Sequence, residues 1–252
     1  MRELDRTPTP LPVPADDVGR VSACAIVGAG RLGTALAAAL RAAGLAIDGP
    51  LGRGADPRGA DAVLLCVPDG EISAAAATVA PGVPVGHCSG ATGLDVLAGH
   101  EAFAIHPLMT VPVTGAPAFA GAGAAVAGST PRALAVAREL AARLGMHATL
   151  VADEDRAAYH AAASIASNFL VTLEGAAERL AGTAGVDRAL LAPLARAAVE
   201  NWARLGAAEA LTGPIARGDD ATVARQRAAV RQRAPDLLPM FDAMADATRA
   251  LA

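Results

Sequence analysis

The sequence predicts an α/β fold, in which a Rossmann-type parallel sheet is followed by a second, all-helical C-terminal domain. Short apolar runs alternate with alanine-rich runs up to residue 152, and such alternation is typical of parallel strands joined by crossover helices. A glycine-rich turn separates the first apolar run from the first alanine-rich run. After residue 152 the strand-like runs stop, and long helical stretches follow.

The first domain is expected over residues 21–152. Strands are predicted at residues 23–27, 45–51, 61–67, 83–87, 102–105, 121–127 and 148–151, and helices at 32–43, 72–79 and 131–144. Pro131 favours a helix start, because proline has no backbone N–H to donate and its φ angle is already helical. Residues 1–20 mix four prolines with charges and lack an apolar run, so we expect a flexible arm there.

The second domain is expected over residues 153–252. Helices are predicted at residues 155–181, 187–205, 219–233 and 235–251. Glycine and proline interrupt the helical pattern at residues 182–185 and 211–215, because these residues end helices for backbone reasons.

Composition excludes several kinds of function. The net charge of −4 is spread evenly along the chain, so no basic face for nucleic acid is indicated. All 21 basic residues are arginine, which excludes any mechanism that needs a lysine. The three cysteines, Cys24, Cys66 and Cys88, lack Cys-x-x-Cys spacing, so we expect small buried side chains and no metal site. Neither a signal peptide nor a membrane helix is indicated, so a cytoplasmic protein is expected.

The segment Gly28-Ala29-Gly30-Arg31-Leu32-Gly33 has the strand–turn–helix context of a dinucleotide-binding loop. In such a loop the first glycine permits the tight turn and the second lets the backbone approach the pyrophosphate. The third lets the helix pack on the strand, and the helix N-terminus attracts the anion. A structural tight turn without a ligand is the alternative.

The end of the second predicted strand bears on the choice of cofactor. An acid there binds the ribose hydroxyls of NAD, whereas an arginine accepts the 2′-phosphate of NADP. The sequence reads Leu51-Gly52-Arg53-Gly54, and Asp48 lies inside the predicted strand. We therefore expect NADP rather than NAD, with Arg53 as the contact; a solvated Arg53 is the alternative, and the loop is also compatible with a deazaflavin.

The later motifs carry a resemblance to a known family. They read Val67-Pro-Asp69, His87-Cys-Ser-Gly90, Ile105-His-Pro-Leu-Met109, Tyr159-His-Ala-Ala-Ala163, Ser167-Asn168 and Leu211-Thr-Gly-Pro-Ile-Ala-Arg-Gly-Asp219. In this order they resemble Rossmann-like proteins with a DUF2520 C-terminal domain. That family is similar to the 6-phosphogluconate dehydrogenase-like and ketopantoate reductase-like oxidoreductases, and the resemblance implies a reductase.

The chain departs from these relatives at the catalytic lysine, which they carry on the first helix after the Rossmann domain. By resemblance, His160 takes the place of that lysine and Ser164 that of an asparagine four residues later, while Asn168 matches a further asparagine. Histidine suits proton donation, because its reference pKa of about 6.5 is close to physiological pH. Either histidine has replaced lysine as the proton donor, or the activity is lost.

The spacing of these residues supports a shared face. On an uninterrupted α-helix of about 3.6 residues per turn, His160, Ser164, Ser167 and Asn168 form one stripe. We expect the stripe to face the substrate; hydrogen bonding to neighbouring helices is the alternative.

Further candidates follow the predicted strands. Loops after parallel strands meet at one edge of the sheet, so we expect Val67, Pro68 and Asp69 to shape the cofactor site. Ser89 and His106 are expected to bind substrate there, with loop-stabilising hydrogen bonds as the alternative.

Arg217 lies in the second glycine- and proline-rich break, where its planar cation suits a substrate carboxylate; an internal ion pair is the alternative. Together these residues predict an NADPH-dependent reductase of a small 2-oxo acid, with 2-dehydropantoate (ketopantoate) the first candidate. An imine or imino-acid reductase, a prephenate-type dehydrogenase and a non-catalytic NADP-binding sensor are the alternatives. We also expect a homodimer, formed through the alanine-rich helices.

Overall fold

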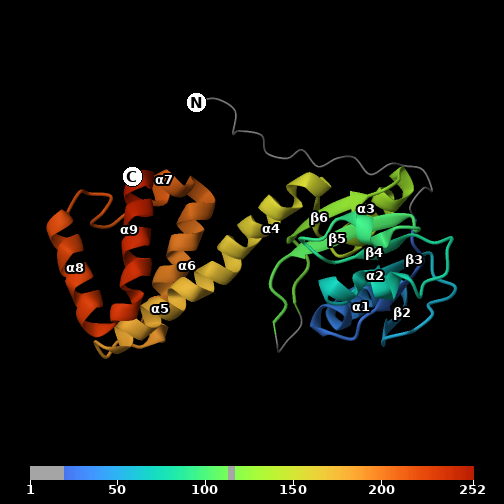
Figure 1. Ribbon diagram of the computed structural model, residues 1–252, viewed down its shortest axis with the longest axis horizontal. Coiled ribbons are helices and arrows are strands. Elements are labelled where there is room, and N and C mark those ends of the chain that lie inside the picture. The colour runs from blue at the N-terminus through green and yellow to red at the C-terminus, as the bar shows by residue number, and fades with distance from the viewer. Residues whose placement is uncertain (1–19, 113–116) are drawn as a thin grey trace, which may run out of the picture. The chain divides into compact units, whose positions relative to one another are not determined.

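The computed structural model describes residues 20–112 and 117–252 (Figure 1). The chain divides into two compact units, Met1–Ser164 and Ile165–Ala252. The arm predicted over residues 1–20 lies, apart from Arg20, outside the described residues.

The first unit contains one mixed sheet, which confirms the predicted fold class. Its strands among the described residues are β1 (Ala23–Val27), β2 (Ala46–Leu51), β3 (Ala62–Leu65), β4 (Val85–His87), β5 (Ala102–Leu108), β6 (Gly123–Gly128) and β7 (His147–Leu150). Their order is β2-β1-β3-β4-β5-β6-β7. The chain leaves β1 for β2 on one side and returns to β3 on the other, so the order reverses between β1 and β3. In open α/β sheets ligands bind at such a reversal, at the carboxyl ends of the strands.

The sheet departs from the expected parallel arrangement at one point. Strand β6 runs antiparallel to β5, whereas the other neighbouring pairs are parallel. Parallel neighbours need a long crossover connection, usually a helix. The described residues between β5 and β6 contain no helix, so the chain turns back beside the strand it has just left.

Helices cover both faces of the sheet. Alternate residues of β1 enter two different apolar clusters, because successive side chains of a strand point to opposite faces. Ile26 packs in the cluster with α1 (Arg31–Ala42) and α3 (Pro131–Arg143), whereas Val27 packs in the cluster with α2 (Ile72–Ala76). These two layers fix the carboxyl ends of the central strands in place.

The helix α4 (Arg156–Ser164) belongs to the first unit, so the division lies beyond the boundary expected near residue 152. The first residue of α4 is Arg156, whose side chain is only 1% exposed. Its Nε donates to Asp153 Oδ1 at 2.8 Å, and its Nη1 donates to the backbone oxygen of Ser89 at 3.4 Å. These contacts attach the start of α4 to the loop after β4.

The second unit is helical, as predicted. It contains a π-helix (Ile165–Phe169), α5 (Leu170–Gly182), α6 (Arg188–Leu205), α7 (Ala207–Ala210), α8 (Asp220–Arg233) and α9 (Leu238–Leu251). The side chains of Asp187 and Asp219 accept hydrogen bonds from backbone N–H groups and so cap the starts of α6 and α8. No helix of the described residues is long and apolar enough to cross a membrane.

Candidate functional site

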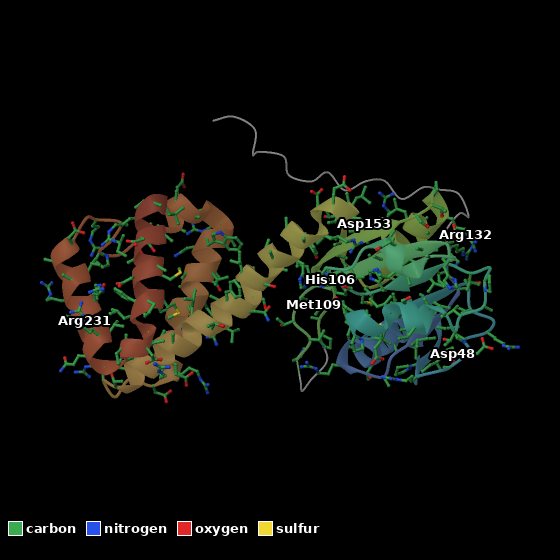
Figure 2. The ribbon with its side chains drawn as sticks, viewed as in Figure 1. Asp48, His106, Met109, Arg132, Asp153 and Arg231 are labelled. Atoms are coloured by element: carbon green, nitrogen blue, oxygen red, sulfur yellow. The ribbon has the colours of Figure 1, made fainter. Side chains whose placement is uncertain are left out.

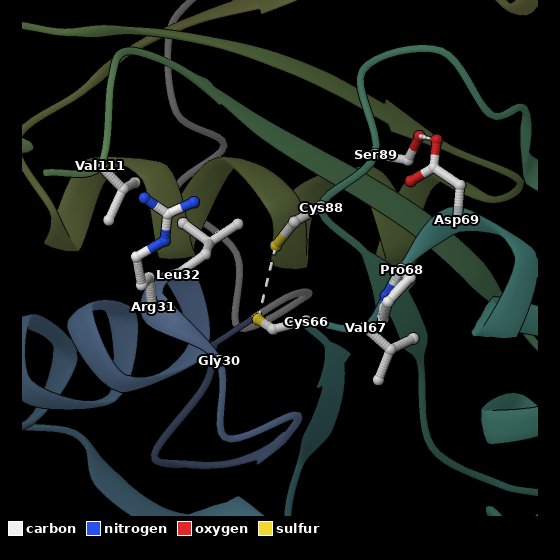
Figure 3. A pocket seen from close by; sticks show the side chains of 10 residues that line it. All are labelled: Gly30, Arg31, Leu32, Cys66, Val67, Pro68, Asp69, Cys88, Ser89 and Val111. Atoms are coloured by element: carbon white, nitrogen blue, oxygen red, sulfur yellow. Dashed lines mark hydrogen bonds between the residues drawn. The ribbon is translucent and has the colours of Figure 1, made fainter. Parts of the chain in front are cut away.

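A cavity of about 460 Å³ lies in the first unit, where the strand order reverses. It is lined by Gly30, Arg31, Leu32, Cys66, Val67, Pro68, Asp69, Cys88, Ser89 and Val111. Figure 3 shows Arg31 and Val111 on one side and Ser89 and Asp69 on the other, with Cys66 and Cys88 between them. The loops after β1, β3 and β4 thus meet in one space, as expected for the carboxyl edge of a parallel sheet.

The glycine loop has the geometry that dinucleotide binding requires. Gly28 has a φ of +117°, and a Cβ atom there would lie 2.2 Å from the backbone oxygen of Cys66. A Cβ atom on Gly33 would lie 2.0 Å from the backbone oxygen of Gly28, so α1 packs directly on the turn. A Cβ atom on Gly30 meets no atom within 4 Å. Close packing therefore needs Gly28 and Gly33, while Gly30 leaves open space.

The N-terminus of α1 is free to bind an anion. Its N-cap residue is Gly30, which offers no side chain to the first N–H groups, and the first turn carries no acidic residue. These N–H groups carry the positive end of the helix dipole. The open space at Gly30 and the uncapped amides both fit a pyrophosphate.

A hydrogen-bond network joins the loops after β3 and β4. Ser89 Oγ lies 2.7 Å from Asp69 Oδ2 and 2.9 Å from Thr92 Oγ1, and it accepts from the backbone N–H of Thr92 at 3.0 Å. Thr92 Oγ1 also donates to Asp69 Oδ2 at 3.1 Å. These hydrogen bonds of Ser89 stabilise its own loop. Loop stabilisation was the alternative to direct substrate contact.

The predicted NADP contact, Arg53, does not line the cavity. Its Nη2 donates to both carboxylate oxygens of Glu71, at 2.8 and 2.7 Å, in a pair whose side chains are 85% and 43% exposed. Asp48 lines a second, smaller cavity with Cys24 and Arg58. Figure 2 shows Asp48 at the opposite end of the first unit from His106.

Two imidazoles meet beside the loop after β4. His106, on β5, and His160, on α4, have ring centroids 6.0 Å apart. Tyr159 Oη lies 2.8 Å from His106 Nδ1. A Cβ atom on Gly90 would lie 2.7 Å from His160 Cδ2 and 2.9 Å from His106 Nε2, so both rings contact the backbone at this glycine.

Burial sets the charge of two histidines in this region. The pKa of His106 is lowered to about 4, mainly by burial and then by the charges of His160 and Arg156, against the opposing effect of Asp69. Burial also lowers the pKa of His87, whose Nε2 lies 3.1 Å from the backbone oxygen of Gly93. The N–H of Ser89 donates to His87 Nδ1, so His87 Nε2 carries the proton and holds the loop. Both imidazoles are therefore neutral near pH 7.

The predicted polar stripe is interrupted. The π-helix Ile165–Phe169 separates His160 and Ser164 from Ser167 and Asn168, so the four residues do not follow one α-helical repeat. The spacing argument assumed an uninterrupted α-helix, and an inserted residue turns the following side chains to another direction. Ser164 and Ser167 are half-buried, and His160 and Asn168 are exposed.

The remaining predicted residues lie in the second unit with Ser167 and Asn168. Arg217 is exposed, two residues before the cap of α8 at Asp219. The substrate-binding roles of Ser164, Ser167, Asn168 and Arg217 stay predictions.

Sequence reasoning missed several residues of the site. Tyr159 and Gly90 belong to motifs that the sequence analysis identified. The functional roles in these motifs were assigned instead to the neighbouring residues, His160 and Ser89. Cys66 and Cys88, whose sulfur atoms lie 3.7 Å apart, line the cavity as well as filling the core. Glu71 gave no signal, because its partner Arg53 is 18 residues away in a different loop.

Comparisons with solved structures show the fold. A candidate NADP oxidoreductase of Bacteroides fragilis is 17% identical with a TM-score of 0.76, over 91% of this chain and 98% of that chain. A Thermotoga maritima protein is 22% identical with a TM-score of 0.74 over the same shares. The Aspergillus terreus reductive aminase, in complex with NADPH and ethyl-5-oxohexanoate, is 17% identical with a TM-score of 0.60, over 92% and 95%.

No protein of curated function matches the chain. The family model for the domain of unknown function DUF2520 matches residues 123–248, which is half of the chain. The chain belongs to the DUF2520 family, in agreement with the motifs of its sequence.

Proposed function

We propose that the protein is an NADPH-dependent oxidoreductase that reduces the carbonyl group of a small 2-oxo acid, with 2-dehydropantoate (ketopantoate) as the first substrate to test. One observation carries the proposal. The carboxyl edge of a single sheet holds both a cavity shaped for a dinucleotide and a pair of contacting imidazoles, His106 and His160. Carbonyl reduction needs a hydride and a proton at one place. At this edge the cavity would hold the cofactor that supplies the hydride, and a histidine would supply the proton.

The chain's own residues account for cofactor binding. The first N–H groups of α1 bind the pyrophosphate, with Gly30 leaving room for it. Val67, Pro68 and Asp69 line the cavity, and hydrogen bonds from Ser89 and Thr92 hold the carboxylate of Asp69 in place. A bound NADPH supplies the hydride.

The preference for NADPH rests on Arg53. The exposed guanidinium of Arg53 forms an ion pair with the carboxylate of Glu71. The 2′-phosphate of NADPH would take the place of this carboxylate, and it carries more negative charge. The Bacteroides fragilis and Aspergillus terreus proteins, whose names include NADP or NADPH, support the same cofactor for this fold.

The proton comes from His160. The chain has no lysine to serve as the donor. His160 is exposed at the carboxyl edge of the sheet, and it contacts the half-buried, neutral His106. The exposed ring is the one that can exchange its proton with solvent between turnovers.

Imine reduction is a second candidate function. It also needs hydride transfer to an unsaturated carbon, and the fold is shared with the reductive aminase of Aspergillus terreus and an imine reductase of Streptomyces aurantiacus. The same groups serve a C=N bond, because fold and cofactor site do not select the substrate.

We also propose that the second unit pairs with a second copy of the chain. Its buried residues, among those that the structure describes, are Val223, Val230, Ala234 and Ala245. Its large exposed apolar side chains include Ile165, Phe169, Val171, Leu190, Leu194 and Trp202, each at least 56% exposed. So small a core does not stabilise a helical unit on its own, and large apolar side chains left exposed in this number favour an oligomer interface.

A substrate panel tests the proposed activity. Purified protein with NADPH is offered 2-dehydropantoate, other 2-oxo acids and cyclic imines, and NADPH oxidation is followed at 340 nm. We expect turnover of at least one compound, and a loss of about 10²–10⁴-fold in kcat for His160→Ala. The control is His147→Ala, which removes an exposed histidine of β7. Tight NADPH binding without turnover would favour the non-catalytic sensor.

A further inference from the structure

We propose that His106 is a second catalytic residue, a neutral imidazole that donates a hydrogen bond from Nε2 to the oxygen or nitrogen of the substrate's reducible bond. Tyr159 is its positioning residue. This inference rests on the proposed function, and it assigns different tasks to the two contacting histidines. His106 stabilises the charge that develops on the substrate atom, and His160 supplies the proton.

The hydrogen bond between Tyr159 and His106 fixes the position of the imidazole proton. Tyr159 Oη lies 2.8 Å from His106 Nδ1, and the two rings meet edge to face, with centroids 5.6 Å apart. Burial raises the pKa of Tyr159, so the phenol keeps its proton. In the arrangement that we propose, this phenol donates its proton to Nδ1. A neutral imidazole has one proton, and with Nδ1 accepting, that proton is on Nε2.

The surroundings of His106 keep the ring neutral. Burial is the largest cause of its low pKa, followed by the positive charges of His160 and Arg156, both on α4. Asp69, at the start of the short helix after β3, acts in the opposite direction. Tyr159 completes the set of titratable neighbours as a neutral hydrogen-bond donor. The N–H donor is therefore present across the neutral pH range.

The Nε2 edge of His106 faces the loop that borders the cavity. A Cβ atom on Gly90 would lie 2.9 Å from both Cε1 and Nε2. Within the described residues, Nε2 makes no hydrogen bond and is not among the polar atoms sealed from solvent. The residue before Gly90 is Ser89, which lines the cavity. The Nε2 of His106 thus lies beside Gly90, one residue along the chain from the cavity lining, and it is accessible and available to a ligand.

The chemistry balances with these two groups. A bound NADPH would supply the hydride by breaking its C4–H bond; the hydride would add to the carbonyl carbon, and the π electron pair would move to the oxygen. The proton of the His160 imidazolium forms the O–H bond and leaves a neutral ring, while His106 keeps its proton throughout. A fixed N–H donor that strengthens its bond as the oxygen becomes negative lowers the barrier of such a step.

The first test is a spectroscopic one and does not depend on turnover. In protein labelled with ¹⁵N-histidine, the His106 signals, assigned by their loss in His106→Gln, should show a single neutral tautomer with the proton on Nε2 from pH 6 to 9. Tyr159→Phe removes only the hydroxyl and should give a mixture of tautomers. A proton on Nδ1 in wild type, or titration near pH 6.5, would overturn the assignment.

The second test uses kinetics on a compound that the wild type reduces. We expect His106→Ala to lower kcat by about 10²–10³-fold, and His106→Gln, which keeps an N–H donor, to recover part of that loss. Tyr159→Phe should lower kcat about tenfold with little change in KM and in NADPH affinity, whereas a merely structural role would reduce NADPH affinity and stability as well. Wild-type kcat in His106→Ala would overturn this inference alone. A wild type that reduces no carbonyl or imine would overturn the proposed function, and with it the catalytic role of His106.

Discussion

Replacing Gly30 with alanine separates the stability of the glycine turn from its ability to bind a dinucleotide. A Cβ atom on Gly30 meets no atom within 4 Å, and the φ of −73° and ψ of −178° suit any residue. Alanine gains about 0.4–1 kcal/mol by restricting the unfolded chain, but it is a poorer helix N-cap than glycine by a comparable amount. We expect the free energy of unfolding of Gly30→Ala to stay within about 1 kcal/mol of wild type.

The same methyl group occupies the space through which a pyrophosphate reaches the N–H groups of α1. A phosphate oxygen within about 2.9 Å of an amide nitrogen cannot share that space with a methyl group. We therefore expect NADPH to bind Gly30→Ala at least tenfold more weakly, which corresponds to about 1.4 kcal/mol.

Two further variants make the assay decisive. Isothermal titration with NADPH gives the affinity, and thermal unfolding without ligand gives the stability. Gly175→Ala, on an open face of α5, should gain stability without changing affinity. Gly33→Ala should lose about 1–3 kcal/mol of stability by overpacking, because its Cβ would lie 2.0 Å from the oxygen of Gly28. If Gly30→Ala binds NADPH within twofold of wild type, the pyrophosphate does not approach this turn.

Three other predictions concern cofactor choice, pH and assembly. Glu71→Gln frees Arg53 and should tighten NADPH binding several-fold at low salt while leaving NADH binding unchanged, as measured by titration; equal effects on both would remove Arg53 from the site. His106 has a folded pKa of about 4, below the unfolded value near 6.5, so the unfolded state gains the proton first as pH falls and stability is lost between these values. Urea unfolding at pH 7 and 4.5 should therefore show a loss for wild type that exceeds that of His106→Gln by up to about 3 kcal/mol, and equal losses would refute the shift. Leu190→Glu with Leu194→Glu should give monomers in sedimentation experiments where wild type gives dimers; a monomeric wild type would refute the paired arrangement.

Much of the fold follows from local sequence patterns. The first strand lies at Ala23–Val27 as predicted, because its apolar run is bounded by a glycine turn with a known conformation. The direction of β6 did not follow, because it depends on the path of the connection rather than on the strand's own residues. The π-helix Ile165–Phe169 was also missed, since alanine-rich sequence around it gives no periodic contrast that would mark an inserted residue.

Local sequence motifs also predicted part of the candidate site. Local motifs identified Gly30 and the Val67–Asp69 loop, which the structure brings to one cavity. The contact between His106 and Tyr159 joins residues 53 positions apart, and its geometry depends on how α4 packs on the sheet. Sequence reasoning named His106 and His160 individually, but their contact at Gly90 required the folded chain.

The most direct test of the proposed activity follows the transferred hydrogen. The protein is mixed with NADPH carrying deuterium at the transferable C4 position and with 2-dehydropantoate, and the product is examined by mass spectrometry. We predict a product one mass unit heavier, with deuterium on the carbon that bore the carbonyl oxygen, in wild type and, more slowly, in His160→Ala. NADPH that binds but delivers no deuterium to 2-dehydropantoate, any other 2-oxo acid or an imine would contradict the assignment of this chain as a reductase.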